Sequence, residues 1–114
     1  MALSDAALIV GANAIDTAIT HMSLHTTGAV TSSANESTAA RVAVNGTVDG
    51  DGDITWTTIA FTGGAASGPA VRVGYWSASS GGTYYGGSLL TGDQAFNAAG
   101  AYTVTSVTET STAT

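Results

Sequence analysis

The chain of 114 residues lacks cysteine, and this absence excludes disulfide bonds and thiolate metal sites. It also lacks lysine, so Arg41 and Arg72 are the only fixed cations of a chain whose formal net charge is −6. Proteins that bind nucleic acids or anionic membranes use several basic side chains, so we expect neither partner. Charged residues make up only 9% of the sequence, so we expect a surface with little like-charge repulsion that suits packing against other copies of the chain.

Long apolar segments are absent as well. No run of eighteen apolar residues occurs, so we expect no transmembrane helix. The first 22 residues carry Asp5 and Asp16 and no basic side chain, which is unlike a secretory signal peptide, so we expect synthesis in the cytoplasm without an export signal. The length and an apolar content of 44% predict one folded domain over residues 1–114.

The N-terminal segment predicts one helix over about residues 4–17. Ser4 followed by Asp5 is typical of a helix N-cap with an acid in the first turn. A narrow apolar stripe at helical spacing is formed by Leu8, Ala12, Ile15 and Ile19. Gly11 weakens the centre of this helix, which therefore needs a surface to pack against.

From His21 onward the apolar pattern alternates, and residues 21–25 predict a short strand. Further strands, separated by turns rich in Gly, Ser and Asp, are predicted at residues 41–45, 53–61, 70–77, 83–90 and 101–110. We therefore expect a mainly β fold with one N-terminal α-helix. It would be an antiparallel β-sandwich or a barrel-like single domain, with the β part over about residues 41–110.

Two of the predicted strands, at residues 53–61 and 101–110, have apolar residues on both faces. Simple alternation over residues 53–61 places Trp56 and Thr58 on one face and Ile59 on the other. In the last strand, Val107 falls on the opposite parity to the preceding apolar residues, which predicts a β-bulge near Ser106.

A long loop over about residues 26–40 has no periodic pattern and no aliphatic side chain larger than that of Val30. Such a segment buries too little apolar surface to offset its own ordering entropy, so we expect an extended arm that contacts other chains. Glu36 and Arg41 are close enough in sequence to fix the end of this arm, by a salt bridge or by separate contacts across an interface. On this hypothesis, deletion of residues 31–37 leaves the domain folded.

The aspartates at positions 49, 51 and 53 alternate like half of a calcium-binding loop. The twelfth residue counted from Asp49 is Ala60, where such a loop needs a glutamate. We interpret the “DGDGD” segment as a hairpin turn, with weak calcium binding as the alternative.

The sequence contains no strong motif for a metal site or a catalytic site. His21 and His25 have no cysteine or carboxylate nearby in sequence to complete a metal site, so we expect loop-anchoring or surface imidazoles, one of them donating to a loop carbonyl. No G-x-S-x-G motif occurs, and no glycine-rich segment stands between a strand and a helix. We therefore expect no enzyme, no catalytic residue, no metal site and no cofactor.

The aromatic residues form two groups. Trp56 and Tyr75 lie on apolar strand faces and are expected in the core. Trp76, Tyr84 and Tyr85 flank a glycine-rich hairpin, where we expect them to be exposed to a ligand or a neighbouring subunit. The candidate interface residues are Glu36, Arg41, Trp76, Tyr84 and Tyr85.

The order of several short motifs along nearly the whole chain resembles the small virion proteins of tailed phages of actinobacteria, which are labelled tail-fibre-like or minor structural proteins. The matching segments are Ser23–Thr26 (“SLHT”), Ala34–Glu36, Ala40–Arg41, Trp76, Gly81–Gly87, Leu90–Thr91 and Ala99–Tyr102. The chain departs from the family where “TGAV” follows “SLHT” in place of “ADPG”, and in its additional “DGDGD” turn. The resemblance implies a non-enzymatic structural protein of the virion and transfers no catalytic residue.

Within a virion, a fibre needs a repetitive shaft or heptads, and the chain has neither. We therefore favour a capsid decoration protein on the outer shell, which contacts copies of itself, with a trimer favoured, and the major capsid protein. A tail or tail-fibre-associated minor tail protein is the alternative. From another class, a carbohydrate-binding module built on Trp76 and Tyr84–Tyr85 is the next hypothesis.

Overall fold

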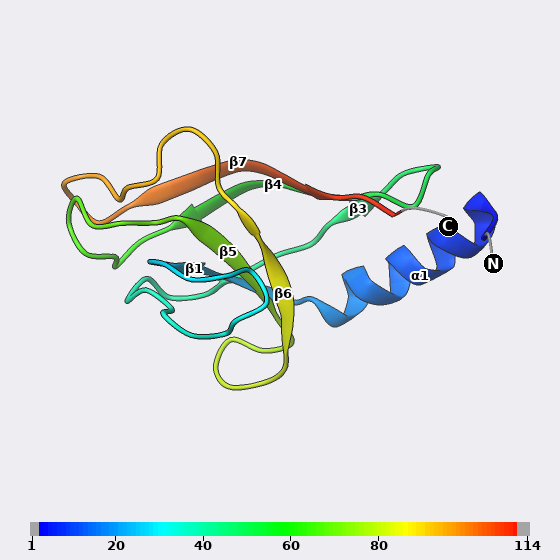
Figure 1. The fold of residues 1–114 in the computed structure, drawn as a ribbon, viewed down its shortest axis with the longest axis horizontal. Helices are drawn as coiled ribbons and strands as arrows, with labels where there is room; N and C mark the ends of the chain where they lie inside the picture. Colours follow the sequence, from blue (N-terminus) through cyan, green and yellow to red (C-terminus); the bar gives the residue numbers. More distant parts are fainter. Residues whose placement is uncertain (1–2, 112–114) are drawn as a thin grey trace.

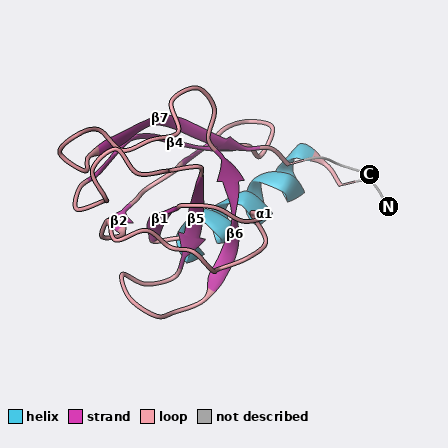
Figure 2. Ribbon diagram, turned by 60° about the vertical axis from the view of Figure 1, so that its left-hand side comes forward, coloured by secondary structure: helices cyan, strands magenta, loops and turns pink. Residues whose placement is uncertain are grey.

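Two antiparallel β-sheets packed against each other form the body of the structure, a computed structural model that describes residues 3–111 (Figure 1). The four-stranded sheet has the spatial order β2 (Val42–Ala43), β1 (His21–His25), β5 (Arg72–Trp76) and β6 (Tyr84–Leu89). The three-stranded sheet has the order β3 (Thr47–Val48), β4 (Ile54–Phe61) and β7 (Tyr102–Glu109). The strands of the two sheets cross each other (Figure 1 and Figure 2). The predicted mainly β fold is confirmed, as a sandwich that does not close into a barrel.

The helix α1 (Asp5–Ala18) begins where its capping residue predicts. The Ser4 hydroxyl accepts a hydrogen bond from the Ala7 amide at 3.3 Å, and Asp5 lies in the first turn. The helix extends beyond the sheets, beside the end of β7 (Figure 1). Among the residues with described structure, no helix has the length and apolar content needed to cross a membrane.

One polar contact and two buried side chains hold the helix to the domain. The Asp16 carboxylate accepts a hydrogen bond from the Gly46 amide at 2.9 Å. Ala12 and Ile19 of the predicted stripe are buried, whereas Ile15 is half-exposed. The C-terminal half of α1 therefore anchors the helix, and its N-terminal half contributes little to the core.

The apolar core lies between the sheets. Its principal members are Met22, Leu24, Ile54, Trp56, Ile59, Phe61, Val73, Tyr75, Val104 and Val107. The rings of Trp56 and Tyr75 stack across the sandwich with their centroids 5.3 Å apart, which confirms the prediction that both are core residues.

The pairing of β4 with β7 explains the irregular parity of both strands. Trp56 lies opposite Val107 and Ile59 lies opposite Val104, and all four side chains are buried. In each strand, two inward residues separated by one outward residue precede an exposed two-residue step. Two further inward residues, again separated by one outward residue, follow this step. We call this step the face switch, defined as Thr57–Thr58 of β4 and Thr105–Ser106 of β7.

The face switch corrects two sequence-based expectations. The predicted bulge near Ser106 is wrong, because the β4–β7 register is the same on both sides of the step. The irregular backbone lies on the partner strand, where Thr58 has a φ of 51°. As a result Ile59 faces the core together with Trp56, and the opposite faces predicted for them are wrong.

Candidate functional site

A layer of buried polar and aromatic side chains covers the outer face of the four-stranded sheet. This polar layer consists of Ser23, His25, Arg72, Trp76 and Tyr84. Residues opposite one another in an antiparallel pair share a face, and the pairing of β1 with β5 brings the histidine opposite the arginine. Ser23, His25 and Arg72 have no exposed surface. The polar layer therefore lies beneath another part of the chain, the loop over residues 26–40.

Arg72 is the centre of the contact between the polar layer and this loop. Its guanidinium donates hydrogen bonds to the carbonyls of Thr27 at 3.0 Å, Ser32 at 2.7 Å and Ala34 at 2.7 Å. A fourth bond, of 3.0 Å, goes to the Tyr84 hydroxyl, which in turn donates to the carbonyl of Val30. Carbonyl dipoles thus solvate this buried cation, and it makes no salt bridge within the described part of the chain.

These contacts correct the expectation of an extended arm. The loop folds back over its own domain, and a single cation binds three of its carbonyls. The Ser37 amide also donates to the carbonyl of Leu24 in β1, and within the loop the Thr26 amide donates to the carbonyl of Asn35. The loop is ordered because the buried Arg72 side chain donates hydrogen bonds to loop carbonyls that no backbone amide of the described residues binds.

His25 supplies the second anchor of the loop. Its Nδ1 lies 2.8 Å from the Ala34 carbonyl, which can only accept, so Nδ1 carries the proton. Its Nε2 then accepts from the Ser23 hydroxyl at 2.6 Å, and that hydroxyl accepts from the Trp76 indole at 2.8 Å. Burial is the main cause that lowers the pKa of His25, and the Arg72 charge adds to it. The prediction of a loop-anchoring imidazole is confirmed for this histidine.

The Ser23–His25 pair has the spacing of an activated nucleophile with its base. Neither side chain has exposed surface, and the hydroxyl is also bonded to an indole, so no substrate reaches the pair in this conformation. We therefore assign it a structural role.

Gly74 makes room for this network, a role that has no direct signal in the sequence. A Cβ built on Gly74 would lie 2.6 Å from His25 Nε2 and 2.7 Å from Ser23 Oγ, both closer than any normal contact. The only local signal is a glycine inside a strand pattern, which indicates close approach of other groups.

A second cluster adjoins the polar layer at the end of the loop. Arg41 forms a bidentate ion pair with Glu36 at 2.9 and 3.0 Å and donates to the carbonyls of Ala78 and Gly81. The guanidinium also lies over the ring of Trp76. The predicted salt bridge between Glu36 and Arg41 is confirmed.

Four of the five candidate interface residues therefore meet in one place: Glu36, Arg41, Trp76 and Tyr84, the last through an edge-to-face contact of 5.1 Å with the indole. The expected exposure of Trp76 is wrong, because 8% of it is exposed and a guanidinium covers its ring. The flat aromatic platform on which the carbohydrate-binding hypothesis rested is therefore absent at this position.

Tyr85, the fifth candidate, lies elsewhere and is 49% exposed. It lines a groove of about 440 Å³ between α1, β6 and the end of β7. At the same groove the Tyr75 hydroxyl donates to the Glu109 carboxylate at 2.6 Å, and burial together with this carboxylate raises the pKa of Tyr75. The groove and the polar layer are thus separate features.

The “DGDGD” segment forms a turn, as the sequence predicts. The Asp49 carboxylate accepts hydrogen bonds from the amides of Asp51 and Asp53. Carboxylate oxygens of the three aspartates lie within 4.8 Å of one another, and two of the three residues are exposed. Weak calcium binding at this turn stays a prediction.

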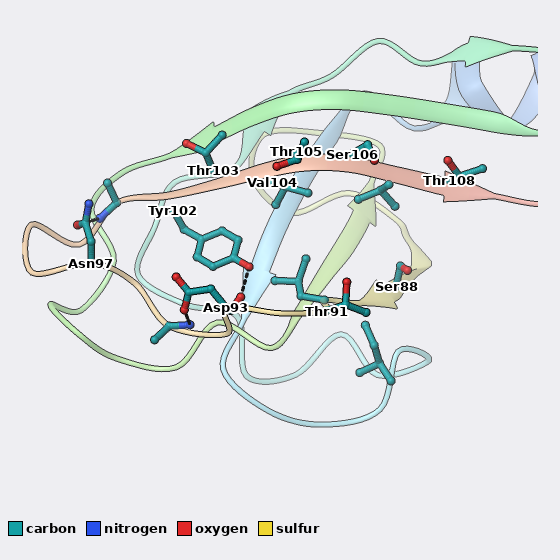
Figure 3. Close-up of a pocket in the computed structure, with 15 residues that line it drawn as sticks. Ser88, Thr91, Asp93, Asn97, Tyr102, Thr103, Val104, Thr105, Ser106 and Thr108 are labelled. Atoms are coloured by element: carbon teal, nitrogen blue, oxygen red, sulfur yellow. Dashed lines mark hydrogen bonds between the residues drawn. The ribbon is translucent and has the colours of Figure 1, made fainter.

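A second groove, of about 570 Å³, runs between β7 and the segment 88–97 (Figure 3). Figure 3 shows Tyr102 and Val104 pointing towards that segment, whereas Thr103 points away. The Tyr102 hydroxyl donates to the carbonyl of Asp93 at one end of the groove. Its other polar lining consists mainly of Ser and Thr side chains, with one carboxylate, that of Asp93, so it offers mostly hydroxyls and backbone groups.

Comparison of the chain with protein-family models, with curated proteins and with solved structures finds no match.

Proposed function

We propose that this chain is a non-enzymatic structural component of a tailed-phage virion, a capsid decoration protein on the outer shell. It would contact copies of itself and other virion proteins such as the major capsid protein. A place in the tail, as a minor tail protein, is the alternative within the same class. The resemblance of the ordered motifs from “SLHT” to the last strand motivates this proposal.

One observation supports it most. Both cations of the chain are used inside the domain, Arg72 to hold three loop carbonyls and Arg41 to hold Glu36 and two further carbonyls. What remains outside is a loop of fixed shape whose exposed side chains are small and uncharged apart from that of Glu36. Such a surface suits contact with other proteins, and it has no free fixed cation within the described residues to recognise phosphate.

The loop is the part of that surface that we expect to touch the shell. Thr27, Ser33 and Asn35 are exposed on it, while the carbonyls beneath them are fixed from inside. A surface that is rigid before binding loses less conformational entropy on docking than an extended arm does. Fixing the loop from inside therefore favours binding without adding contacts.

The test is to localise the protein on particles of the phage that encodes it. Antibodies against the purified chain, read by electron microscopy, are expected to label the head. Labelling confined to the tail would overturn the decoration role and support the alternative. Absence of the chain from purified particles would overturn the virion function altogether.

A pair of variants tests the loop surface. Thr27→Glu with Ser33→Glu adds charge to the outer face of the loop while its carbonyl anchors stay in place, and we expect uptake into particles to fall. Ala66→Glu with Ala98→Glu adds the same charge to exposed turns outside the loop, and we expect normal uptake. Equal uptake of the two variants would mean that the loop surface is not the contact.

A further inference from the structure

The strand β7 is an open edge of its sheet. It is the last strand in the order β3-β4-β7 and has eight residues, Tyr102–Glu109. Among the described residues, no backbone–backbone hydrogen bond reaches its free side. The groove of about 570 Å³ lies between β7 and the segment 88–97, and the Tyr102 hydroxyl bonds the Asp93 carbonyl at one end of it. The edges formed by β2 and β3 are two residues long, and β6 contains two glycines, so β7 is the longest regular edge of the fold.

Soluble proteins usually protect such an edge with lysine, proline or a bulge that twists it away. None of these devices is present in β7, whose sequence YTVTSVTE has one charged side chain and no register shift against β4. The amide and carbonyl groups on its free side match the backbone of another extended strand. The occupant of this edge is therefore a β-strand.

The face switch restricts which strand fits. A partner strand would extend the sheet and keep its own inward side chains on the core side. Such a strand must have the same pattern as β7, with alternating inward residues on both sides of an exposed two-residue step. Within the described chain two strands have this pattern, β4 and β7, and β4 is already paired on the other side. The strand that fits is thus β7 of a second copy.

The face switch also fixes the register. An antiparallel pair centred on the switch places Thr105 opposite Ser106 of the second copy and Val104 opposite its Val107. It further places Thr103 opposite Thr108 and Tyr102 opposite Glu109. Exposed residues then face exposed residues, and inward residues face inward ones. A shift by two residues would set an inward valine against an exposed residue of the step, so this register is the one that keeps the faces matched.

Charge favours the same antiparallel arrangement. The acidic turn lies at the C-terminal end of β7, where the Asp53 carboxylate accepts from the Ser111 amide. A parallel pair would bring the acidic turns of the two copies side by side. The antiparallel pair separates them to opposite ends and places Glu109 against a tyrosine, so no like charges lie opposite each other along the strand.

We propose that two copies of this chain associate about a twofold axis through antiparallel pairing of their β7 strands, with Thr105 of one copy opposite Ser106 of the other. The result is one six-stranded sheet in the order β3-β4-β7-β7-β4-β3. This inference rests on the self-association part of the proposed function and is independent of the virion part. It replaces the trimer expected from the sequence with a dimer in solution.

Two charge variants of the full chain test the pairing and its register. Thr103→Lys with Thr108→Lys sets like charges opposite each other in both symmetry-related pairs. Thr103→Lys with Thr108→Glu sets opposite charges in the same places. Both threonines are exposed, so the fold is expected to survive each change. Analytical ultracentrifugation should give twice the chain mass of 11.2 kDa for the wild type and the opposite-charge variant. The like-charge variant should dimerise about tenfold more weakly or worse.

A control pair, Thr57→Lys with Ala60→Lys, places the same charges on exposed positions of β4 away from the edge and should leave the dimer unchanged. Circular dichroism verifies that each variant is folded. A wild-type monomer at about 1 mM, a wild-type trimer, or equal dimerisation of the two charge variants would overturn the inference. A monomer that still enters particles would overturn the inference alone, and a dimer absent from particles would overturn the proposed function alone.

Discussion

The guanidinium of Arg41 lies over the ring of Trp76, with its central carbon 3.6 Å from the ring centroid. This contact is shielded, because 8% of the arginine side chain is exposed, against 30% of the side chain of its ion-pair partner Glu36. Cation–π attraction is stronger when water is excluded, and an ion pair with an exposed partner is weaker. The arginine therefore stabilises the fold mainly through the ring and the carbonyls it binds.

The first prediction separates these contributions. Arg41→Ala removes the cation–π contact, the ion pair and two charged hydrogen bonds, and we expect the free energy of unfolding to fall by about 2–3 kcal/mol. Glu36→Gln removes only a partly exposed charge and should cost about 0.5 kcal/mol or less. Urea denaturation measures both, and tryptophan emission should shift to longer wavelength in the arginine variant. Equal losses in the two variants would show that the ion pair, not the ring contact, dominates.

The second prediction concerns Arg72. Arg72→Met fills a similar volume but leaves the carbonyls of Thr27 and Ser32 without a donor and removes one of the two donors of the Ala34 carbonyl, so we expect a loss of about 3 kcal/mol or more. Arg72→Lys keeps the charge and loses the planar fork, and should fall between the wild type and the methionine variant. The loop over residues 26–35 should also become sensitive to a nonspecific protease. A methionine variant with wild-type stability and an uncut loop would contradict the anchoring role.

The third prediction reverses an expectation from the sequence. Deletion of Thr31–Ser37 removes two of the carbonyls that solvate Arg72 and the partner of His25 Nδ1. The deletion leaves a buried cation with two of its four hydrogen-bond partners, which is costly, so we expect a destabilised or unfolded domain rather than an intact one. Circular dichroism and thermal unfolding check this, with Gly50→Ala as a neutral surface control. A deletion variant as stable as the wild type would restore the hypothesis of a dispensable arm.

The sequence predicted those parts of the fold that depend on local signals. Ser4 and Asp5 fixed the start of the helix, and alternation placed Trp56 and Tyr75 in the core. The Glu36–Arg41 pair was visible because its members are five residues apart. Each of these features follows from residues close together in the chain.

The polar layer could not be predicted in the same way. Arg72 alternates in sequence with the apolar residues Val71, Val73 and Tyr75, but this alternation does not reveal what covers the face of the strand on which Arg72 lies. The partners of the guanidinium are backbone carbonyls 38–45 residues away, and a carbonyl has no signal in the sequence. Thr58 is similar, because a positive φ at a β-branched residue opposes local preference, and the pairs with β7 on either side of it link residues far apart in the sequence.

The fourth prediction tests whether the side chains of the polar layer need a glycine at position 74. Gly74→Ala places a methyl group 2.6 Å from His25 Nε2, so the histidine or the strand must shift, at a cost of about 1–3 kcal/mol. Gly50→Ala has no atom within 4 Å and should change stability by about 0.5 kcal/mol or less. Urea denaturation compares the two changes under the same conditions. Equal effects would mean that the network tolerates displacement.

The fifth prediction is a pH dependence that originates at His25, whose pKa in the folded chain lies below its usual value of 6.5 because it is buried. Protonation would place a second ring proton against the Ser23 hydroxyl, whose oxygen already accepts from the Trp76 indole. Between the folded pKa and 6.5 the unfolded chain binds a proton that the folded chain does not. Stability is therefore fully present above about pH 6.5 and is lost as the pH falls towards the folded value, with a slope of at most about 1.4 kcal/mol per pH unit.

The matched variant is His25→Gln, which keeps a donor and an acceptor but does not titrate. We expect it to be less stable than the wild type at about pH 7.5, because its geometry fits the network less well, and to have a flatter profile down to about pH 5. Above that pH the carboxylates remain mostly ionised in the unfolded chain, so their contribution is similar in both proteins and cancels in the comparison. Urea denaturation across this range yields the difference between the two profiles. Parallel profiles would show that the buried imidazole is not the titrating group.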